Sequence, residues 1–169
     1  MRAGSVLSLL PAPQEPGAKP GESKPQKVFE ETYGIDEFRI SPDGKWVAYM
    51  SRESGQPEVD VASFPAFTNR RQISIGGAVQ PLWRADGKEL FFLANDRKLM
   101  AVDVKAGATL ETGPLRTLFQ TNVGQSSQVH YYAVTRDGKR FLLREPVGSN
   151  AAAVEQLYLV TNWTSLVGR

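Results

Sequence analysis

Short apolar runs alternate with polar turn residues along most of this chain, and the runs recur in the same order. Three of the polar breaks are the Asp-Gly pairs Asp43-Gly44, Asp86-Gly87 and Asp137-Gly138, each followed by a lysine. Each pair lies between runs rich in β-branched and aromatic residues, which is a strong signal of a β-hairpin. We expect a type I′ turn there, with positive φ at both central residues. The pattern therefore predicts three hairpins of one kind.

The three hairpins recur at the interval of a β-propeller blade. The first two Asp-Gly pairs lie 43 residues apart and the next two lie 51 apart, and one four-stranded blade takes roughly 40–50 residues. No helical periodicity is sustained along the sequence, so the structured part is expected to be all-β. The predicted fold is a partial β-propeller of about three four-stranded blades, with approximate boundaries at 36–77, 78–122 and 128–163.

Four strands are expected in each of the first two units and three in the third. The expected strands span 38–40, 46–51, 59–62 and 72–75, then 82–83, 90–94, 99–104 and 117–120, then 131–134, 141–144 and 157–161. The third unit thus lacks one strand. Glu30 precedes Asp43 by the same 13 residues that separate Ile73 from Asp86. By this register, residues 28–32 occupy the place of an outermost strand, and we expect them to complete the last blade.

The N-terminal residues 1–27 are predicted to form a flexible linker or tail, ahead of a partial propeller over 28–169. They hold five prolines among Gly, Ser, Lys and Glu, a composition that buries too little apolar surface to offset chain entropy. The apolar run at the very start is weak as a signal peptide and too short to span a bilayer. No membrane insertion by this segment is expected.

Three blades are too few to close a ring, because propellers typically have four to eight. The chain is therefore the C-terminal piece of a longer propeller, or several chains complete one ring, or the blades form an open arc. We favour the first. Self-association through open blade edges is also expected, because an unpaired strand edge is a template for further pairing.

Composition excludes several classes of function. The formal charge is only +2 and the basic residues are scattered, so a nucleic-acid partner is not expected. There is no cysteine, which excludes disulfides and thiolate metal sites but leaves the compartment open.

The first Asp-Gly segment, Ser41-Pro42-Asp43-Gly44-Lys45 followed by Trp46–Tyr49, is similar to the TolB-type β-propeller repeat. Over residues 58–65 and 81–93, and at its ending 160–164, the chain resembles the C-terminal sensor-like propeller of certain bacterial serine/threonine protein kinases. The resemblance covers roughly residues 36–163. It implies a binding or assembly module, extracytoplasmic (periplasmic) where a membrane-spanning helix follows the kinase domain. Asp60 and Ala62 depart from the family pattern, which has an aromatic and a polar residue there.

No catalytic motif accompanies the repeat. The Gly-rich nucleotide loop, the His-Arg-Asp loop and the Asp-Phe-Gly motif of kinases are absent, as is the G-x-S-x-G elbow of hydrolases. His130 is the only histidine, and without partner motifs a packed or solvated place at a strand end is its more common role. We therefore expect no enzyme activity, no catalytic residue, no metal site and no cofactor.

Binding residues are expected in the loops before the inner strands, because loops on a rigid scaffold often carry function. The candidates for such a rim are Asp36, Glu37, Gln80 and Gln128. The turn aspartates could in principle bind a cation, but their turn chemistry already explains them. The aromatic residues are assigned to packing between blades rather than to a ligand platform.

The function predicted from the sequence is a non-catalytic binding or sensor scaffold for a protein or a small ligand. The resemblance makes it the C-terminal part of a multidomain bacterial protein such as a receptor-type serine/threonine kinase. Two alternatives remain, namely the gating propeller of a prolyl-oligopeptidase-like hydrolase and a TolB-like periplasmic envelope protein.

Overall fold

The computed structural model describes residues 5–10, 24–107, 109–124, 126, 129–147 and 154–161. In these residues it contains thirteen strands and no helix, which confirms the all-β fold class. The strands are β1 (Ser5–Leu9), β2 (Gln26–Glu31), β3 (Ile35–Ile40), β4 (Trp46–Ser51), β5 (Glu58–Ser63), β6 (Arg71–Gln72), β7 (Ala78–Trp83), β8 (Glu89–Ala94), β9 (Lys98–Ala106), β10 (Leu110–Gln120), β11 (Tyr132–Val134), β12 (Arg140–Val147) and β13 (Val154–Thr161). None of the described segments forms a helix that is long and apolar enough to span a membrane.

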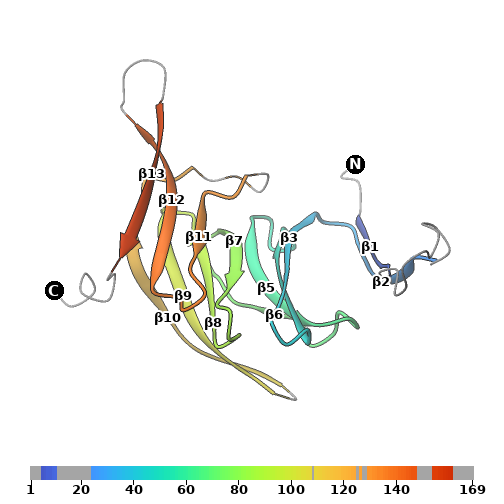
Figure 1. Ribbon diagram of the computed structural model, residues 1–169. Coiled ribbons are helices and arrows are strands. Elements are labelled where there is room, and N and C mark those ends of the chain that lie inside the picture. The colour runs from blue at the N-terminus through green and yellow to red at the C-terminus, as the bar shows by residue number, and fades with distance from the viewer. Residues whose placement is uncertain are drawn as a thin grey trace, which may run out of the picture.

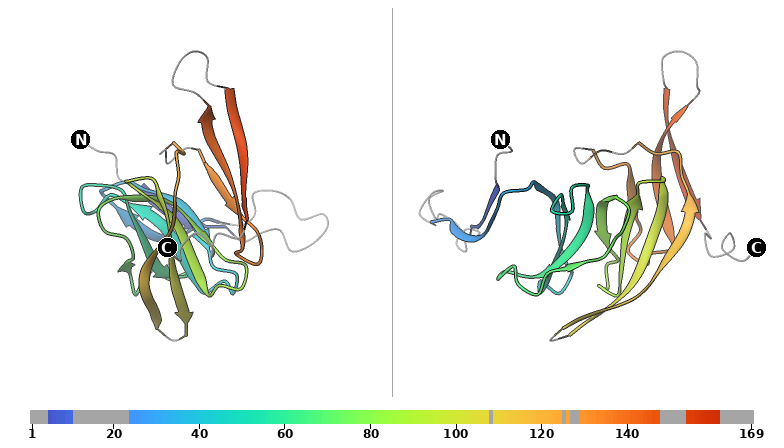
Figure 2. Two further views of the ribbon diagram at one scale, coloured as in Figure 1. Left: turned by 90° about the vertical axis from the view of Figure 1, so that its left-hand side faces the viewer. Right: turned by 180° about the vertical axis from the view of Figure 1, so that it is seen from behind.

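Three antiparallel sheets follow one another along the chain, and we call them blades one, two and three. Blade one has the strand order β3-β4-β5-β6, blade two β7-β8-β9-β10 and blade three β11-β12-β13. The sheets stand side by side, with β1 and β2 beyond blade one and blade three at the opposite end (Figure 1). The view from behind shows the same order (Figure 2). The fold is thus a partial β-propeller, as the Asp-Gly repeat predicted.

The fourth strand of blade two is longer than predicted. The sequence pattern predicted that it begins at residue 117, after Gly113 and Pro114. In the structure β10 begins at Leu110, and its pairing with β9 shifts register between Thr112 and Leu115. The interruption is a β-bulge, where a proline does not have to donate to the ladder.

The first described strand lies inside the segment predicted to be a linker. Ser5–Leu9 forms β1, which pairs antiparallel with β2, while residues 11–23 lie outside the described part. The predicted pairing of residues 28–32 with the last blade is wrong in this structure, because their strand β2 pairs with β1. Blade three has no fourth strand among the described residues. β1 is a much nearer partner along the chain, so that pairing closes a far shorter loop.

Each Asp-Gly pair connects the two innermost strands of its blade. In blade one the N–H of Ser41 donates to the carbonyl of Trp46 at 2.8 Å, and the N–H of Gly44 donates to the carbonyl of Ser41 at 2.9 Å. Within each Asp-Gly pair only the glycine has positive φ, +71° at Gly44 and +72° at Gly87 and Gly138. The hairpin prediction is confirmed and the type I′ prediction is wrong. Between the bonded residues Ser41 and Trp46 the loop has four residues rather than two, and such loops are most often built around a type I turn.

The turn aspartates are bonded within their own loops. The Asp43 carboxylate accepts the N–H of Lys45 at 3.2 Å and the hydroxyl of Ser41 at 2.6 Å. The Asp86 and Asp137 carboxylates each accept the N–H of the following lysine at 3.0 Å. Side-chain hydrogen bonds from Ser41, Arg84 and Thr135, respectively, are the main cause of the lowered pKa of the three carboxyls. The assignment of these residues as structural turns agrees with this bonding.

Turns of neighbouring blades also contact each other. A Cβ atom at Gly87 would lie 3.6 Å from Pro42 of the preceding turn, and one at Gly138 would lie 2.6 Å from the Cδ atom of Arg84. Glycine at position 138 therefore satisfies both the backbone conformation and the close approach of the next blade.

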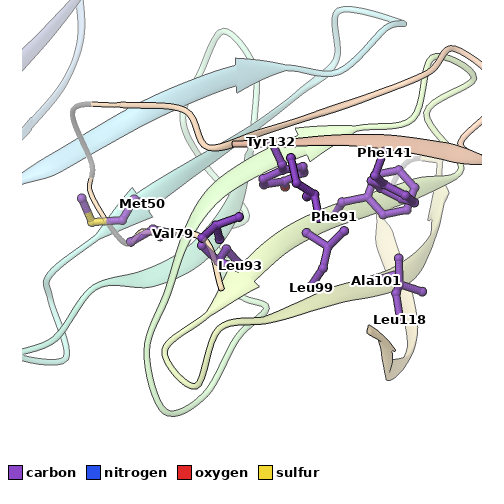
Figure 3. Packing of buried hydrophobic residues seen from close by; sticks show 11 residues of the cluster. Met50, Val79, Phe91, Leu93, Leu99, Ala101, Leu118, Tyr132 and Phe141 are labelled. Atoms are coloured by element: carbon purple, nitrogen blue, oxygen red, sulfur yellow. The ribbon is translucent and has the colours of Figure 1, made fainter. Parts of the chain in front are cut away.

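The hydrophobic core lies between the blades, and β8 is buried on both faces. Leu90 and Phe92 pack toward blade one, whereas Phe91 packs toward blade three, because successive side chains of a strand point to opposite faces. The Phe91 ring meets the Phe141 ring edge-on, with 5.2 Å between centroids (Figure 3). The two inter-blade layers include Trp46, Ala48, Val59, Val61, Leu90, Phe92 and Val102 on one side and Phe91, Leu93, Leu99, Tyr132, Phe141 and Leu143 on the other. Aromatic residues thus join the blades, as expected.

Gly44 isolates the energetic effect of the turn conformation, because a Cβ atom there would meet nothing within 4 Å. We expect Gly44→Ala to lower the free energy of unfolding by about 1 kcal/mol, since alanine would be forced into left-handed φ. Gly44→Asn should cost less, because asparagine tolerates that conformation. Urea denaturation measures both, with Gly34→Ala as a control at a glycine that lacks positive φ. Equal losses for alanine and asparagine would contradict this explanation.

Candidate functional site

Bulges in the innermost strands of blades one and two free two polar residues from the β-ladder. The β3–β4 register shifts between Asp36 and Arg39, and the β7–β8 register shifts between Val79 and Leu82. Glu37 and Gln80 lie in these bulges, and each has a φ of +60°. They are 43 residues apart, the same interval as the first two Asp-Gly pairs. The repeat thus places one bulged residue on each inner strand.

The bulged residues connect one blade to the next, and we call this series of bonds the inter-blade ladder. The N–H of Gln80 donates to the carboxylate of Glu37 at 2.5 Å. The N–H of Tyr131 donates to the side-chain carbonyl of Gln80 at 3.0 Å. Tyr131 lies six residues before Asp137, as Gln80 lies six before Asp86, so it is the corresponding residue of blade three. In both steps, a side-chain oxygen of one blade accepts a backbone N–H of the next.

Gln80 is fully buried and its polar atoms are well bonded. Its side-chain amide donates to the carbonyls of Ser126 and Val129 at 2.9 and 2.6 Å. Its backbone carbonyl accepts the Tyr132 hydroxyl at 2.6 Å. With 0% of its surface exposed, it offers nothing to a ligand. The predicted rim residue Gln80 therefore joins blade two to blade three.

The other predicted rim residues differ in accessibility. Asp36 is exposed, Glu37 is partly buried, and Gln128 lies outside the described residues. Burial raises the pKa of Glu37, against the opposing effect of the Gln80 N–H. The second carboxylate oxygen of Glu37 is buried without a hydrogen-bond partner in the described part of the structure. Among the predicted rim residues that the structure describes, Glu37 is thus the one whose ionisable side chain is held by a hydrogen bond from the next blade.

Arg39, which is not among the residues predicted from the sequence, lies beside His130. Its guanidinium donates to the Nε2 atom of His130 and, at 2.8 Å, to the carbonyl of Phe38. Its own carbonyl accepts the indole N–H of Trp83 at 2.8 Å. Burial and the positive charge of Arg39 lower the pKa of His130, so the imidazole is neutral at neutral pH and acts as an acceptor.

We call Asp36, Glu37, Arg39 and His130 the inner-strand cluster. No carboxylate forms an ion pair with Arg39 among the described residues. Arg39 and Glu37 still interact electrostatically at longer range. Arg39 as a whole is half-buried, and its guanidinium keeps part of its hydrogen-bonding capacity for an anion. Within the described part of the chain, the hydrogen bonds of His130 are with Arg39, and none joins it to an acid or a nucleophile as in a catalytic triad.

A second set of polar residues lies in blade one, around a cavity of about 160 Å³. Glu53, Glu58 and Asp60 are among the residues that line it. Glu58 is buried and accepts the N–H groups of Gly76 and Gly77, each at 2.9 Å, so its role is structural. Burial raises the pKa of Asp60 to about 6, although Arg70 opposes this shift. No group of three or more His, Cys, Asp or Glu side chains in the described ranges is arranged so that it could hold a metal ion.

Comparison with known proteins finds likeness in fold. No family model matches the chain, and no curated protein matches it. Its TM-score is 0.51, at 19% identity, with a candidate 6-phosphogluconolactonase from Bacteroides uniformis, over 89% of this chain and 44% of that one. The TM-score is 0.35 at 18% identity with TolB from Acinetobacter baumannii, over 83% and 46% of the two chains. With an uncharacterized protein from Listeria monocytogenes it is 0.46 at 13% identity, over 99% and 49%.

The chain spans less than half the length of each of these solved structures. At such identities the likeness to the Bacteroides protein concerns the fold alone. The arrangement of sheets is thus one that a longer chain also adopts.

The bonds of Gln80 predict a large effect of an apolar replacement. Gln80→Met keeps the size of the side chain but leaves the Tyr131 N–H and two loop carbonyls without their partners. We expect the free energy of unfolding to fall by about 3 kcal/mol, because each buried unsatisfied group costs about 1–3 kcal/mol. Chemical denaturation measures the loss. The matched variant Gln26→Met, at an exposed strand position, should change stability by less than about 0.5 kcal/mol.

Asp60 predicts a pH dependence of stability. Its pKa of about 6 in the folded protein exceeds the value of 3.8 for a free carboxyl, so between these values the folded state binds more protons than the unfolded state. Its contribution therefore destabilises the protein as pH rises from 4 to 6. Relative to wild type, Asp60→Asn should gain stability over this range and be more stable at pH 7. Thermal unfolding across the pH range measures the difference.

The matched control is Asp96→Asn, because Lys98 lowers the pKa of Asp96. An ionised Asp96 stabilises the fold above its unfolded pKa, so this variant should be less stable than wild type at pH 7. The same sign for both variants would contradict the assignment.

Proposed function

We propose that this chain is a non-catalytic binding scaffold that recognises an acidic group, with Arg39 as its recognition point. The single observation behind this proposal is the inner-strand cluster, in which His130 and the Phe38 carbonyl orient a guanidinium that has no ion-paired carboxylate among the described residues. A planar guanidinium favours carboxylate and phosphate groups, which it can bind through two parallel hydrogen bonds. The partner is thus an acidic small molecule or an acidic segment of a protein.

The rigidity of the surroundings supports this role. Arg39 lies on β3, whose bulge is fixed by the bond between Glu37 and Gln80, and the Trp83 indole bonds the Arg39 backbone from the neighbouring blade. A side chain held by two blades loses little freedom when it binds a ligand. Glu37 and Asp36 also lie close by, and their negative charges oppose part of the attraction between Arg39 and an anion.

We also propose that the scaffold serves as the sensor segment of a receptor-type bacterial serine/threonine kinase. The support is the resemblance of residues 58–65 and 81–93 to the propellers of such proteins. In that setting, the acidic ligand would be extracytoplasmic and the kinase domain would belong to another part of the polypeptide. The scaffold itself would contribute binding and not phosphoryl transfer.

Calorimetric titration with citrate and with a short glutamate-rich peptide tests the recognition point. We expect Arg39→Gln to weaken binding about tenfold, the amount expected for one charge-assisted hydrogen bond, and Arg39→Lys to retain part of the affinity. The control variant is Arg136→Gln, at an exposed arginine of the blade-three turn, which should bind like wild type. Equal affinity of wild type and Arg39→Gln for both ligands would overturn the proposal, as would no binding of either ligand to wild type.

A further inference from the structure

The two N-terminal strands have the arrangement of the outer half of a blade. β2 leads directly into β3 of blade one, just as β6 leads into β7 of blade two. In both four-stranded blades, the last strand in sequence lies at the sheet edge and pairs only with the third. β2 and β1 therefore correspond to a fourth and a third strand. Within the described residues β1 pairs with β2 alone, so the edge of β1 that would face a second strand is open.

Aromatic packing holds this half-blade against blade one. The Phe29 ring of β2 stacks on Phe67 with 4.6 Å between centroids, and the guanidinium of Arg70 lies 5.2 Å from the Phe29 centroid. Arg70 also donates to the hydroxyls of Tyr33 and Tyr49, each at 2.9 Å. The half-blade is thus fixed on the face of blade one that is turned away from blade two.

The inner part of that face carries an exposed apolar residue. Ile40, on the innermost strand, is 52% exposed. It lies 43 residues before Trp83, and Trp83 packs against the core between blades one and two. By this register, Ile40 is placed to pack against the inner strands of a blade before blade one.

The inter-blade ladder has an open step at the same place. The N–H of Gln80 is bonded to Glu37 and the N–H of Tyr131 to Gln80. The N–H of Glu37 begins the series, because the described structure holds no inner strand before β3 to offer it a side chain. At the other end, Tyr131 has no side-chain carbonyl. The series can therefore be extended before blade one but not, in the same chemistry, after blade three.

We propose that the open edge of β1 and the inner face of β3 together bind one β-hairpin of this same repeat. The hairpin carries an Asp-Gly turn and, six residues before its aspartate, a Glu or Gln whose side-chain oxygen accepts the N–H of Glu37. Its second strand pairs with β1 and completes a four-stranded blade from two polypeptide segments. The Bacteroides protein that shares this arrangement of sheets is longer, and this chain covers 44% of it.

The test uses the full chain and a fluorescent peptide with the sequence of residues 33–52, which contains the β3–β4 hairpin. Fluorescence anisotropy should show saturable binding. In the peptide, Glu37→Ala should weaken binding about tenfold and Glu37→Gln should retain it, because glutamine still offers a carbonyl oxygen. A peptide N-methylated at alternate residues of its second strand should not bind, since it cannot form the strand ladder. Equal binding of the N-methylated peptide overturns the proposal.

An isolated hairpin is marginally stable in water, so a second variant carries the peptide covalently. Residues 33–57, which include the natural connection to a third strand, are duplicated and joined to Met1 of the full chain. This variant should have a higher midpoint of thermal unfolding than wild type, and Glu37→Ala in the duplicated copy should remove most of the gain. No binding of the peptide together with no gain in the fusion overturns the proposal. So does a dimer of the wild-type chain that excess peptide fails to dissociate, because a second copy would then occupy the edge.

Discussion

A backbone amide that reaches from one blade to a side-chain oxygen of the blade before it is the interaction on which this arrangement depends. It requires a bulge in the innermost strand, because only a residue outside the regular ladder has its N–H and side chain free for a neighbouring sheet. Glu37 and Gln80 meet this requirement with the same φ of +60°. Their bonds fix the order and spacing of the blades at one end of the inner strands, and the apolar layers fill the space behind.

At the other end of the inner strands, neighbouring blades are in close steric contact through their turns. Pro42 lies against Gly87 and Arg84 against Gly138, so the turn of each blade rests on the glycine of the next. Between the two ends, β8 contributes one face to each apolar layer. The inter-blade contacts thus combine polar bonds at one end of the inner strands, close approach of the turns at the other end, and apolar burial along β8. This rigid frame is what allows Arg39 and His130, 91 residues apart in sequence, to meet at a defined place.

The local features of this fold could be predicted from the sequence, whereas those that depend on distant partners could not. The Asp-Gly hairpins and the strands beside them were predictable, because turn chemistry and alternation act over a few residues. The four-residue connection was misread as a two-residue turn, since Asp-Gly occurs in both. β1 was missed because its five residues adjoin a proline-rich segment. The contact between Arg39 and His130 depends on the relative position of two blades. The role of Gln80 depends on a β-bulge that the local sequence does not indicate.

The position of Gln80 also affects how the protein unfolds. In many repeat proteins each unit contacts only its neighbours through apolar surface, and stability is close to a sum of local contributions. Here the loss of blade three would also break the bonds of the Gln80 side-chain amide to the carbonyls of Ser126 and Val129 and the bond of the Tyr132 hydroxyl to the backbone carbonyl of Gln80. The last blade is therefore not a separable end cap, and fraying from the C-terminal side is coupled to the middle of the molecule.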